Sequence, residues 1–316
     1  MTRLGPSELV RTAAIARRYY LDGRSKVELA EEFGLSRFKI ARILDEAVAQ
    51  GIVTISIALP SQIDAELSDV IRQQFGLRRA VVIDTADEDE VALRTHLGRV
   101  AAEMLGEIVQ DGDVLGMSWG RTLIAMSEQL TRLARCTIVQ LTGVSLTAAE
   151  ETGSVELVRR AARVSGGPAY PIYAPLMVPD AVTAANLSKQ PEVAEAMRQY
   201  DRLNVAVLTV GSWDPPSSLA YDVWPQPERG RLRVQGAVAE ICARIIDDQG
   251  RHMEGESSGR VVAITIDQLR KVPEVVLVSG GRAKRRAVAA ALRSGFITSL
   301  ITDANVAHAL LDPEQP

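Results

Sequence analysis

The sequence predicts an α/β protein in which a small helix-turn-helix domain precedes a larger Rossmann-like domain. Residues 1–51 contain only helical patterns with capping and turn signals, whereas residues 80–311 alternate short apolar runs with amphipathic helical patterns. Strands that alternate with helices favour a largely parallel sheet covered by helices. The length of 316 residues also fits about two domains.

The composition excludes several classes of protein. Hydrophobic residues make up 47% and charged residues 24%, which is ordinary globular usage and excludes a mainly disordered or fibrous chain. The apolar runs are too short to span a bilayer, and the first residues lack the apolar core of a signal peptide. Cys136 and Cys242 are too few for a disulfide framework. We expect a cytoplasmic protein without membrane contact.

Three helices are expected in the first domain. The first covers residues 7–20. Ser25 and Glu28 have the spacing of a capping box at the start of a second helix that ends near Gly34. Ser36 can cap a third helix, which ends at Gly51. Its inward-facing apolar residues recur at helical spacing: Ile40, Ile43, Leu44, Ala47 and Val48.

The third helix has the features of a DNA-reading helix. A short helix, a glycine turn and an amphipathic helix are typical of the helix-turn-helix. The outer face carries Arg37, Phe38, Lys39 and Arg42, of which the arginines suit guanine or phosphate and the phenylalanine suits a thymine methyl group. The alternative is a solvated basic face on an ordinary helical bundle.

The charge distribution places a domain boundary after this unit. Residues 1–51 hold nine Lys and Arg against seven Asp and Glu, and the remaining residues hold 27 against 33. We therefore expect a DNA-binding domain over residues 1–58 and an effector and oligomerisation domain over residues 59–316.

Two elements are expected between the domains. The alternation over Ile52–Ile57 predicts a short strand. Residues 62–75 predict a helix, interpreted as a connector and a candidate dimerisation element. Its inward residues are Ile63, Leu67, Val70 and Ile71.

The second domain alternates strands and helices. Strands are expected at residues 80–83, 113–116, 137–140, 205–210, 261–266, 275–278 and 296–301. Helices are expected at residues 90–110, 122–134, 190–202, 282–293 and 303–311. Because such sheets bind ligands beyond the carboxyl ends of their strands, the residues that follow each strand are the candidate site.

One of these loops, residues 116–122, has the chemistry of a phosphate site. It contains glycines, opens a helix whose first N–H groups favour an anion, and adds the hydroxyls of Ser118 and Thr122. It lacks the Gly-Lys-Ser/Thr ending of a P-loop and the spacing of a dinucleotide fingerprint. The alternative is a tight strand-to-helix turn.

Three further loops complete the candidate site. Gly280 and Gly281 follow a strand, and Lys284 is expected one turn into the helix that begins there, near an N-terminus where a cation is unfavourable unless an anion binds. The alternative is a solvated lysine. Gln140 and Thr142, and Gly211 in the last loop, offer groups that suit sugar hydroxyls, although turn formation is the simpler explanation.

Together these features resemble the SorC family of bacterial transcriptional regulators, which is related to the DeoR-type regulators. The resemblance is carried by residues 25–51, 116–122, 236–250 and 275–311. It implies an effector domain similar to ribose-5-phosphate isomerase and glucosamine-6-phosphate deaminase, with a phosphorylated sugar as ligand. It also implies a homotetramer, and phosphate contacts at Ser118, Gly120, Arg121, Thr122 and Lys284.

The sequence departs from the family at Ala239 and Glu240, where the family commonly has Asp after Gly. A carboxylate there can accept hydrogen bonds from sugar hydroxyls, and the alternative is a solvated helix residue.

The main alternative function is a sugar-phosphate isomerase or deaminase-like enzyme, since fold does not decide function. His96, His252 and His308 have no partnered acid-base motif, and no metal-ligand spacing is present. We expect no catalysis, metal or cofactor. The expected partners are double-stranded operator DNA and a phosphorylated sugar effector, bound by a homodimer or homotetramer.

Overall fold

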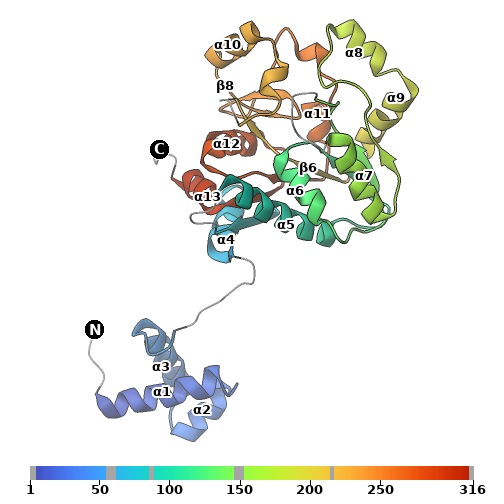
Figure 1. The fold of residues 1–316 in the computed structure, drawn as a ribbon. Helices are drawn as coiled ribbons and strands as arrows, with labels where there is room; N and C mark the ends of the chain where they lie inside the picture. Colours follow the sequence, from blue (N-terminus) through green and yellow to red (C-terminus); the bar gives the residue numbers. More distant parts are fainter. Residues whose placement is uncertain (1–4, 55–61, 85–88, 146–152, 214–216, 313–316) are drawn as a thin grey trace. The chain divides into compact units, whose positions relative to one another are not determined.

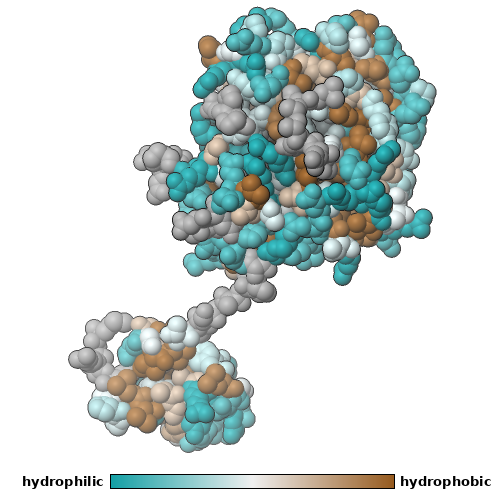
Figure 2. Space-filling model, in the orientation of Figure 1, coloured by the Kyte–Doolittle hydropathy of each residue, from teal (hydrophilic) through white to brown (hydrophobic). Residues whose placement is uncertain are grey.

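The computed structural model describes residues 5–54, 62–84, 89–145, 153–213 and 217–312 (Figure 1). The chain divides into two compact units, Met1–Ala58 and Leu59–Pro316. Each unit has its own apolar core. On the face of the second unit seen in Figure 2, apolar residues lie among hydrophilic ones, as is normal for a globular surface.

The first unit contains the three predicted helices, α1 (Pro6–Tyr20), α2 (Lys26–Phe33) and α3 (Arg37–Ala49). The capping box is present, because the Ser25 N–H donates to the Glu28 carboxylate at 2.8 Å and the Glu28 N–H donates to the Ser25 hydroxyl at 3.3 Å. Gly34 ends α2 in the left-handed conformation, with φ of 62°. The Lys39 N–H donates to the Ser36 hydroxyl at 3.2 Å and so caps α3.

Two expectations for the first unit are wrong. Val48 is 43% exposed and not inward-facing, because the buried stripe of α3 ends at Ala47. Residues 51–54 form a turn and not the start of a strand. The Val53 N–H donates to the Ala47 carbonyl at 3.0 Å, and this bond folds the chain back onto α3, where Ile52 packs against the core. The rest of that predicted strand, Ile55–Ile57, lies outside the described residues.

The second unit is built on an eight-stranded sheet with the order β1-β2-β12-β11-β6-β3-β4-β5. All neighbouring strands are parallel except β1 and β2. The mixed α/β fold with a parallel sheet is thus confirmed. In chain order the strands are β1 (Ile63–Asp64), β2 (Arg79–Ile83), β3 (Val114–Met117), β4 (Thr137–Gln140), β5 (Ala169–Tyr170), β6 (Val205–Leu208), β11 (Glu274–Val278) and β12 (Ser299–Asp303).

Helices cover both faces of this sheet, which explains why most residues of its central strands are buried and apolar. One face packs against α5 (Glu90–Ile108), α6 (Arg121–Gln129) and α7 (Ser154–Ser165). The other packs against α4 (Ala65–Gln74), α9 (Pro191–Arg198), α12 (Arg285–Arg293) and α13 (Ala304–Leu311). Three further helices, α8 (Ala181–Leu187), α10 (Gln226–Val234) and α11 (Ile266–Leu269), lie in the segments between the strands.

A second, antiparallel sheet was not predicted. It has the order β10-β9-β8-β7 and lies in the chain between β6 and β11. Its strands are β7 (Gly211–Ser212), β8 (Ala237–Ile241), β9 (Arg244–Asp247) and β10 (His252–Met253). The turn between β8 and β9 places Cys242 and Ala243 at φ of 52° and 60°. Because neither is the glycine or asparagine typical of such hairpin turns, the sequence carried no turn signal.

Two predicted elements, the helix at residues 62–75 and the strand at residues 261–266, differ in the structure. Ile63 belongs to β1, and Val70 on α4 is 43% exposed. Helix α4 is not a connector, because it packs on β2 within the second unit through Leu67 and Ile71. Residues 261–266 form isolated bridges and the start of α11, not a strand, because their apolar pattern reflects a buried loop.

The boundaries of other predicted elements also differ. The helix expected at residues 122–134 ends at Gln129, and the one expected at residues 190–202 is α9 followed by a 3-10 turn, Gln199–Arg202. Strand β12 begins at Ser299, three residues later than expected, after a buried loop. The predicted helix 282–293 begins as a 3-10 turn, η4 (Arg282–Lys284), and continues as α12 from Arg285.

Candidate functional site

The strand order brings three predicted loops to one edge of the sheet. Strand β6 lies between β3 and β11, and all three are parallel. Their carboxyl ends therefore lie side by side, and a cleft of about 160 Å³ opens there. The loops contribute Trp119, Gly120, Arg121, Thr122, Thr209, Val210, Gly211, Gly280, Gly281, Ala283 and Lys284. The remaining lining residues are Glu90, Leu93, Arg94, Ser217, Leu219 and Glu240.

Ser118, Gln140 and Thr142 were predicted site residues, yet none of them lines the cleft. The Ser118 hydroxyl is buried and accepts the Thr209 N–H at 3.3 Å, so it holds the neighbouring loop. The Gln140 amide donates to the Thr142 carbonyl at 2.6 Å and to the Ser154 hydroxyl at 2.9 Å. Ser118 thus bonds to a loop of the cleft, whereas Gln140 bonds to residues that do not line it.

Glycines let the loops approach one another closely. A Cβ atom on Gly120 would lie 2.5 Å from Thr209 Cγ2, and one on Gly280 would lie 2.5 Å from Asp303 Oδ2. Gly281 has φ of 93° and donates its N–H to Asp303 Oδ2 at 2.6 Å. The other oxygen of Asp303 accepts the Asn305 N–H at 2.9 Å at the start of α13. The buried aspartate thus ties the loop after β11 to β12.

Lys284 is the cation of the cleft. It is the last residue of η4, at the N-cap of α12, and not one turn inside a helix. Its Nζ donates to the Val210 carbonyl at 2.6 Å. Loss of hydration lowers the pKa of Lys284 to about 8, an effect that Glu240 opposes and that Arg121 adds to. A cation with poor hydration and no closely bonded carboxylate suits an anionic ligand.

Glu240 lies opposite Gly211, in a buried strand and not on a solvated helix. Its carboxylate accepts the Ser218 hydroxyl at 3.2 Å and the Ala243 N–H at 2.9 Å. Burial raises the pKa of Glu240, whereas the Ala243 N–H and the Lys284 charge act to lower it. A Cβ atom on Gly211 would collide with Glu240 Oε1, so glycine is needed for this approach.

Sequence reasoning missed several lining residues. Glu90 and Arg94, which form an ion pair, come from the first turns of α5, a segment that the loop argument did not consider. Trp119 was part of a loop of interest but was not selected. Its indole Nε1 is buried and has no hydrogen-bond partner among the described residues, which leaves a donor beside the cleft.

The predicted DNA-reading residues lie on one helix of the first unit. Arg37, Phe38 and Arg42 are exposed, Phe38 to 88%, whereas Lys39 is half-buried. Arg42 also forms an ion pair with Glu46 at 3.4 Å.

Neither a metal-binding cluster nor a membrane-spanning helix is found among the described residues. No three His, Cys, Asp or Glu side chains among them gather as a metal site would require. Within the same residues, no helix is both long and apolar enough to cross a membrane.

Comparisons with known proteins agree with this architecture. A family model described as "Putative sugar-binding domain" matches residues 60–312. The transcriptional regulator YjhU of Escherichia coli is 29% identical, over 94% of this chain and 93% of its own. The deoxyribonucleoside regulator of Bacillus subtilis is 28% identical, over 94% of this chain and 96% of its own.

The fold itself matches a solved structure. The full-length sorbitol operon regulator SorC of Klebsiella pneumoniae superimposes with a TM-score of 0.74 at 23% identity, covering 97% of this chain and all of that one. Because the family model spans most of the sequence, the chain belongs to the sugar-binding domain family of SorC-type transcriptional regulators.

Proposed function

We propose that the chain binds operator DNA through residues 1–58 and that a phosphorylated sugar in the cleft controls its affinity for DNA. The observation that carries the effector proposal is the convergence of Lys284, Arg121 and the start of α6 on one cleft. The names of two relatives, the deoxyribonucleoside regulator and the sorbitol operon regulator, support a ligand of the sugar class.

The start of α6 is the proposed phosphate position. Its N-cap, Gly120, provides no side-chain cap, so its first N–H groups can bind an anion. The Thr122 hydroxyl, the Arg121 guanidinium and the Lys284 ammonium line the same cleft. Charge-assisted hydrogen bonds from such groups are stronger than neutral ones. A phosphate dianion satisfies this set better than a neutral hydroxyl does.

The rest of the ligand is proposed to lie toward Glu240. This carboxylate can accept hydrogen bonds from sugar hydroxyls, and the Thr209 and Ser217 side chains line the cleft with it. Because the carboxylate is already fixed by Ser218 and Ala243, it is preorganised to read the position of a hydroxyl. The departure from the family at Ala239 and Glu240 is proposed to alter which sugar is accepted.

For DNA binding, α2 and α3 are proposed to form a helix-turn-helix in which α3 enters the major groove. The exposed Arg37 and Phe38 are placed to contact base edges. Arg42 must leave Glu46 to contact DNA. We propose a homodimer or homotetramer acting on cytoplasmic DNA, since a symmetric assembly can bind two half-sites.

The enzyme alternative is not supported. The relatives and the structural neighbours are named as transcriptional regulators, and the chain is accordingly a regulator and not an enzyme.

The effector proposal is tested by thermal shift with sugar phosphates and their neutral counterparts. The phosphorylated set is expected to raise the melting temperature more, and Lys284→Met is expected to abolish the difference. Lys271→Met, at an exposed lysine, serves as the matched control and should behave as the wild type does. Equal shifts for both ligand sets would reject phosphate recognition.

The DNA proposal is tested on duplexes selected from a random library with the full-length protein. Arg37→Ala is expected to weaken binding by about 1–3 kcal/mol if the residue reads a base. Arg17→Ala, on the exposed side of α1, should leave affinity nearly unchanged. Unchanged affinity in both Arg37→Ala and Arg42→Ala would reject α3 as the reader.

A further inference from the structure

A second hollow, of about 820 Å³, lies in the second unit next to the cleft. The elements around it, α10, β8, α12, α13 and α4, follow one another along one side of the unit (Figure 1). We call it the arginine groove, because it is lined by Arg233, Arg282, Arg285, Arg286 and Arg293. Its apolar wall is formed by Phe75, Ala237, Val238, Ala283, Ala289, Ala309 and Leu310.

The charge of the groove is unbalanced. Asp248 is the single carboxylate among its lining residues. The Arg293 guanidinium donates to the backbone carbonyl of Asp248 at 2.8 Å and not to its carboxylate. Arg282 and Arg286 are exposed and form no ion pair within the described part of the chain. They flank Lys284, the N-cap of α12, where the helix dipole disfavours positive charge.

The chemistry of the lining selects a class of ligand. Guanidinium groups bind phosphates through paired hydrogen bonds and also stack on planar rings. Phe75, Ala289 and Leu310 are half-buried and line the groove, so an occupant with an apolar, planar part would cover them. An inorganic phosphate would satisfy the arginines and leave this wall exposed. The volume is within the range of roughly 300–1,000 Å³ that is common for small-molecule sites.

We propose that the arginine groove binds a nucleoside diphosphate or triphosphate, with the phosphates on the arginines and the base against the apolar wall. This site is separate from the sugar cleft. Lys284 and Gly211 line the cleft, whereas Arg282 and Ser212 line the groove, so η4 and β7 form the wall between the two. The proposal therefore stands independently of the cleft's ligand.

The test is calorimetric titration of the full-length protein with ATP, adenosine and tripolyphosphate. ATP is expected to bind more tightly than either fragment. The double variant Arg282→Ala/Arg286→Ala is expected to weaken ATP binding at least about tenfold. The matched control is Arg159→Ala/Arg163→Ala, which removes two exposed arginines at the same spacing on α7 and should leave ATP binding unchanged. Lys284→Met should also retain it, which separates the groove from the cleft.

Three results would overturn the proposal. Equal affinity for ATP and tripolyphosphate would show an unspecific anion surface without a place for the base. An equal loss in the α7 control would show that total positive charge, and not the groove, binds the nucleotide. Absence of ATP binding, together with a lower oligomeric state of the Arg282→Ala/Arg286→Ala variant in sedimentation, would assign the groove to contact with a second copy of the chain.

Discussion

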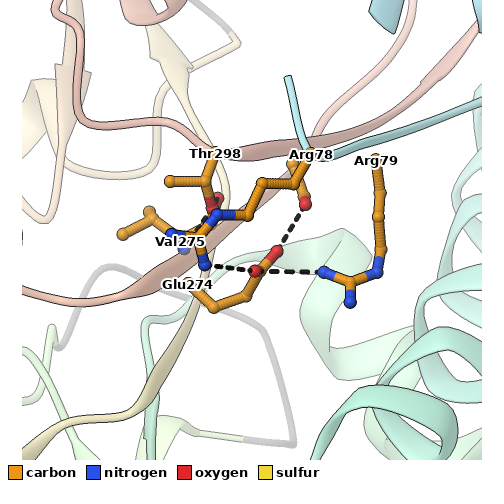
Figure 3. Close-up of polar contacts among 6 residues, drawn as sticks. Arg78, Arg79, Glu274, Val275 and Thr298 are labelled. Carbon is orange, nitrogen blue, oxygen red and sulfur yellow. Dashed lines mark hydrogen bonds and ion pairs between the residues drawn. The ribbon is translucent and has the colours of Figure 1, made fainter. Parts of the chain in front are cut away.

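Buried charged side chains have different partners at the two ends of the parallel strands. At the amino end, Glu274 of β11 accepts hydrogen bonds from Arg78 at 3.3 Å and from the Ser299 hydroxyl, and pairs with Arg79 at 3.0 Å (Figure 3). At the carboxyl end, Lys284 donates to a backbone carbonyl, and the nearby Glu240 is bonded to Ser218 and Ala243. The first end bonds its buried charge directly to opposite charges, whereas at the second Lys284 and Glu240 attract each other but each hydrogen-bonds to neutral groups.

This difference separates a structural cluster from a binding site. A carboxylate that accepts from two guanidiniums and a hydroxyl has most of its acceptor sites occupied by the protein, so we assign it a role in the fold and not in ligand binding. The Lys284 ammonium is poorly hydrated and donates to a carbonyl, so it can still gain a charge-assisted hydrogen bond from an incoming anion. The sequence alone shows both as charged residues near strand ends. The structure distinguishes them by their partners.

The largest expected effect concerns the amino end. Glu274→Ala is expected to lower the free energy of unfolding by about 2–3 kcal/mol, because it leaves the fully buried Ser299 hydroxyl without its acceptor and separates the arginines from their carboxylate. Arg78→Ala should cost at most about 1 kcal/mol, since that side chain is 58% exposed. Denaturant unfolding measures both. If Glu274→Ala unfolds like the wild type, the cluster is not structural.

The next effect concerns the carboxyl end and should appear in binding. Lys284→Met is expected to weaken binding of a phosphorylated sugar about tenfold or more, because a charge-assisted hydrogen bond is lost. Its unfolding free energy should change by less than about 1 kcal/mol, since a poorly hydrated cation is removed along with one hydrogen bond. Glu274→Ala, in contrast, should lower the free energy of unfolding and leave the affinity for the phosphorylated sugar unchanged. A Lys284→Met protein that loses stability and keeps its affinity would reverse the assignment of the two ends.

The smallest effect is a pH dependence. The pKa of Lys284 is lowered from 10.5 to about 8, so in the folded protein the lysine loses its proton as the pH rises through 8. Affinity for a phosphorylated sugar should therefore fall several-fold between pH 7 and 9, where the phosphate itself stays a dianion. Lys284→Arg should flatten the profile because arginine keeps its charge.

The same shift has a defined sign for stability. Between pH 8 and 10.5 the unfolded chain retains the proton on Lys284 and the folded chain does not, so this group's contribution to stability rises with pH over that interval. Below pH 8 the folded protein carries the full cost of burying the charged Lys284 ammonium. A ligand-free Lys284→Met protein should lack this rise, and an identical rise in both proteins would assign it to other groups.

Local signals made much of the fold predictable. The capping box at Ser25, the glycine cap at Gly34 and the apolar strands of the large sheet each leave a pattern over a few residues. The antiparallel sheet left none, because β8 is buried throughout and its hairpin turn uses Cys242 and Ala243. At residues 261–266 the apolar pattern predicted a strand, but it belongs to a buried loop.

The candidate site was predictable only where it followed chain order. Loops after β3, β6 and β11 could be selected because carboxyl ends of parallel strands share an edge. Which loops adjoin depends on the strand order, and this order brings β6 between strands that are far apart in sequence. Arg94 from α5 was therefore missed, and Gln140, at the end of the strand beyond β3, was wrongly expected at the cleft.

We expect ligand binding in the cleft and DNA binding by residues 1–58 to be energetically coupled. If a phosphorylated sugar changes DNA affinity by some factor, DNA must change the sugar's affinity by the same factor. The measurement is a titration of the sugar identified by thermal shift, with and without selected operator DNA at matched salt. The sugar is expected to bind with different affinity in the two titrations. Identical affinities, in a protein that binds each ligand separately, would contradict it.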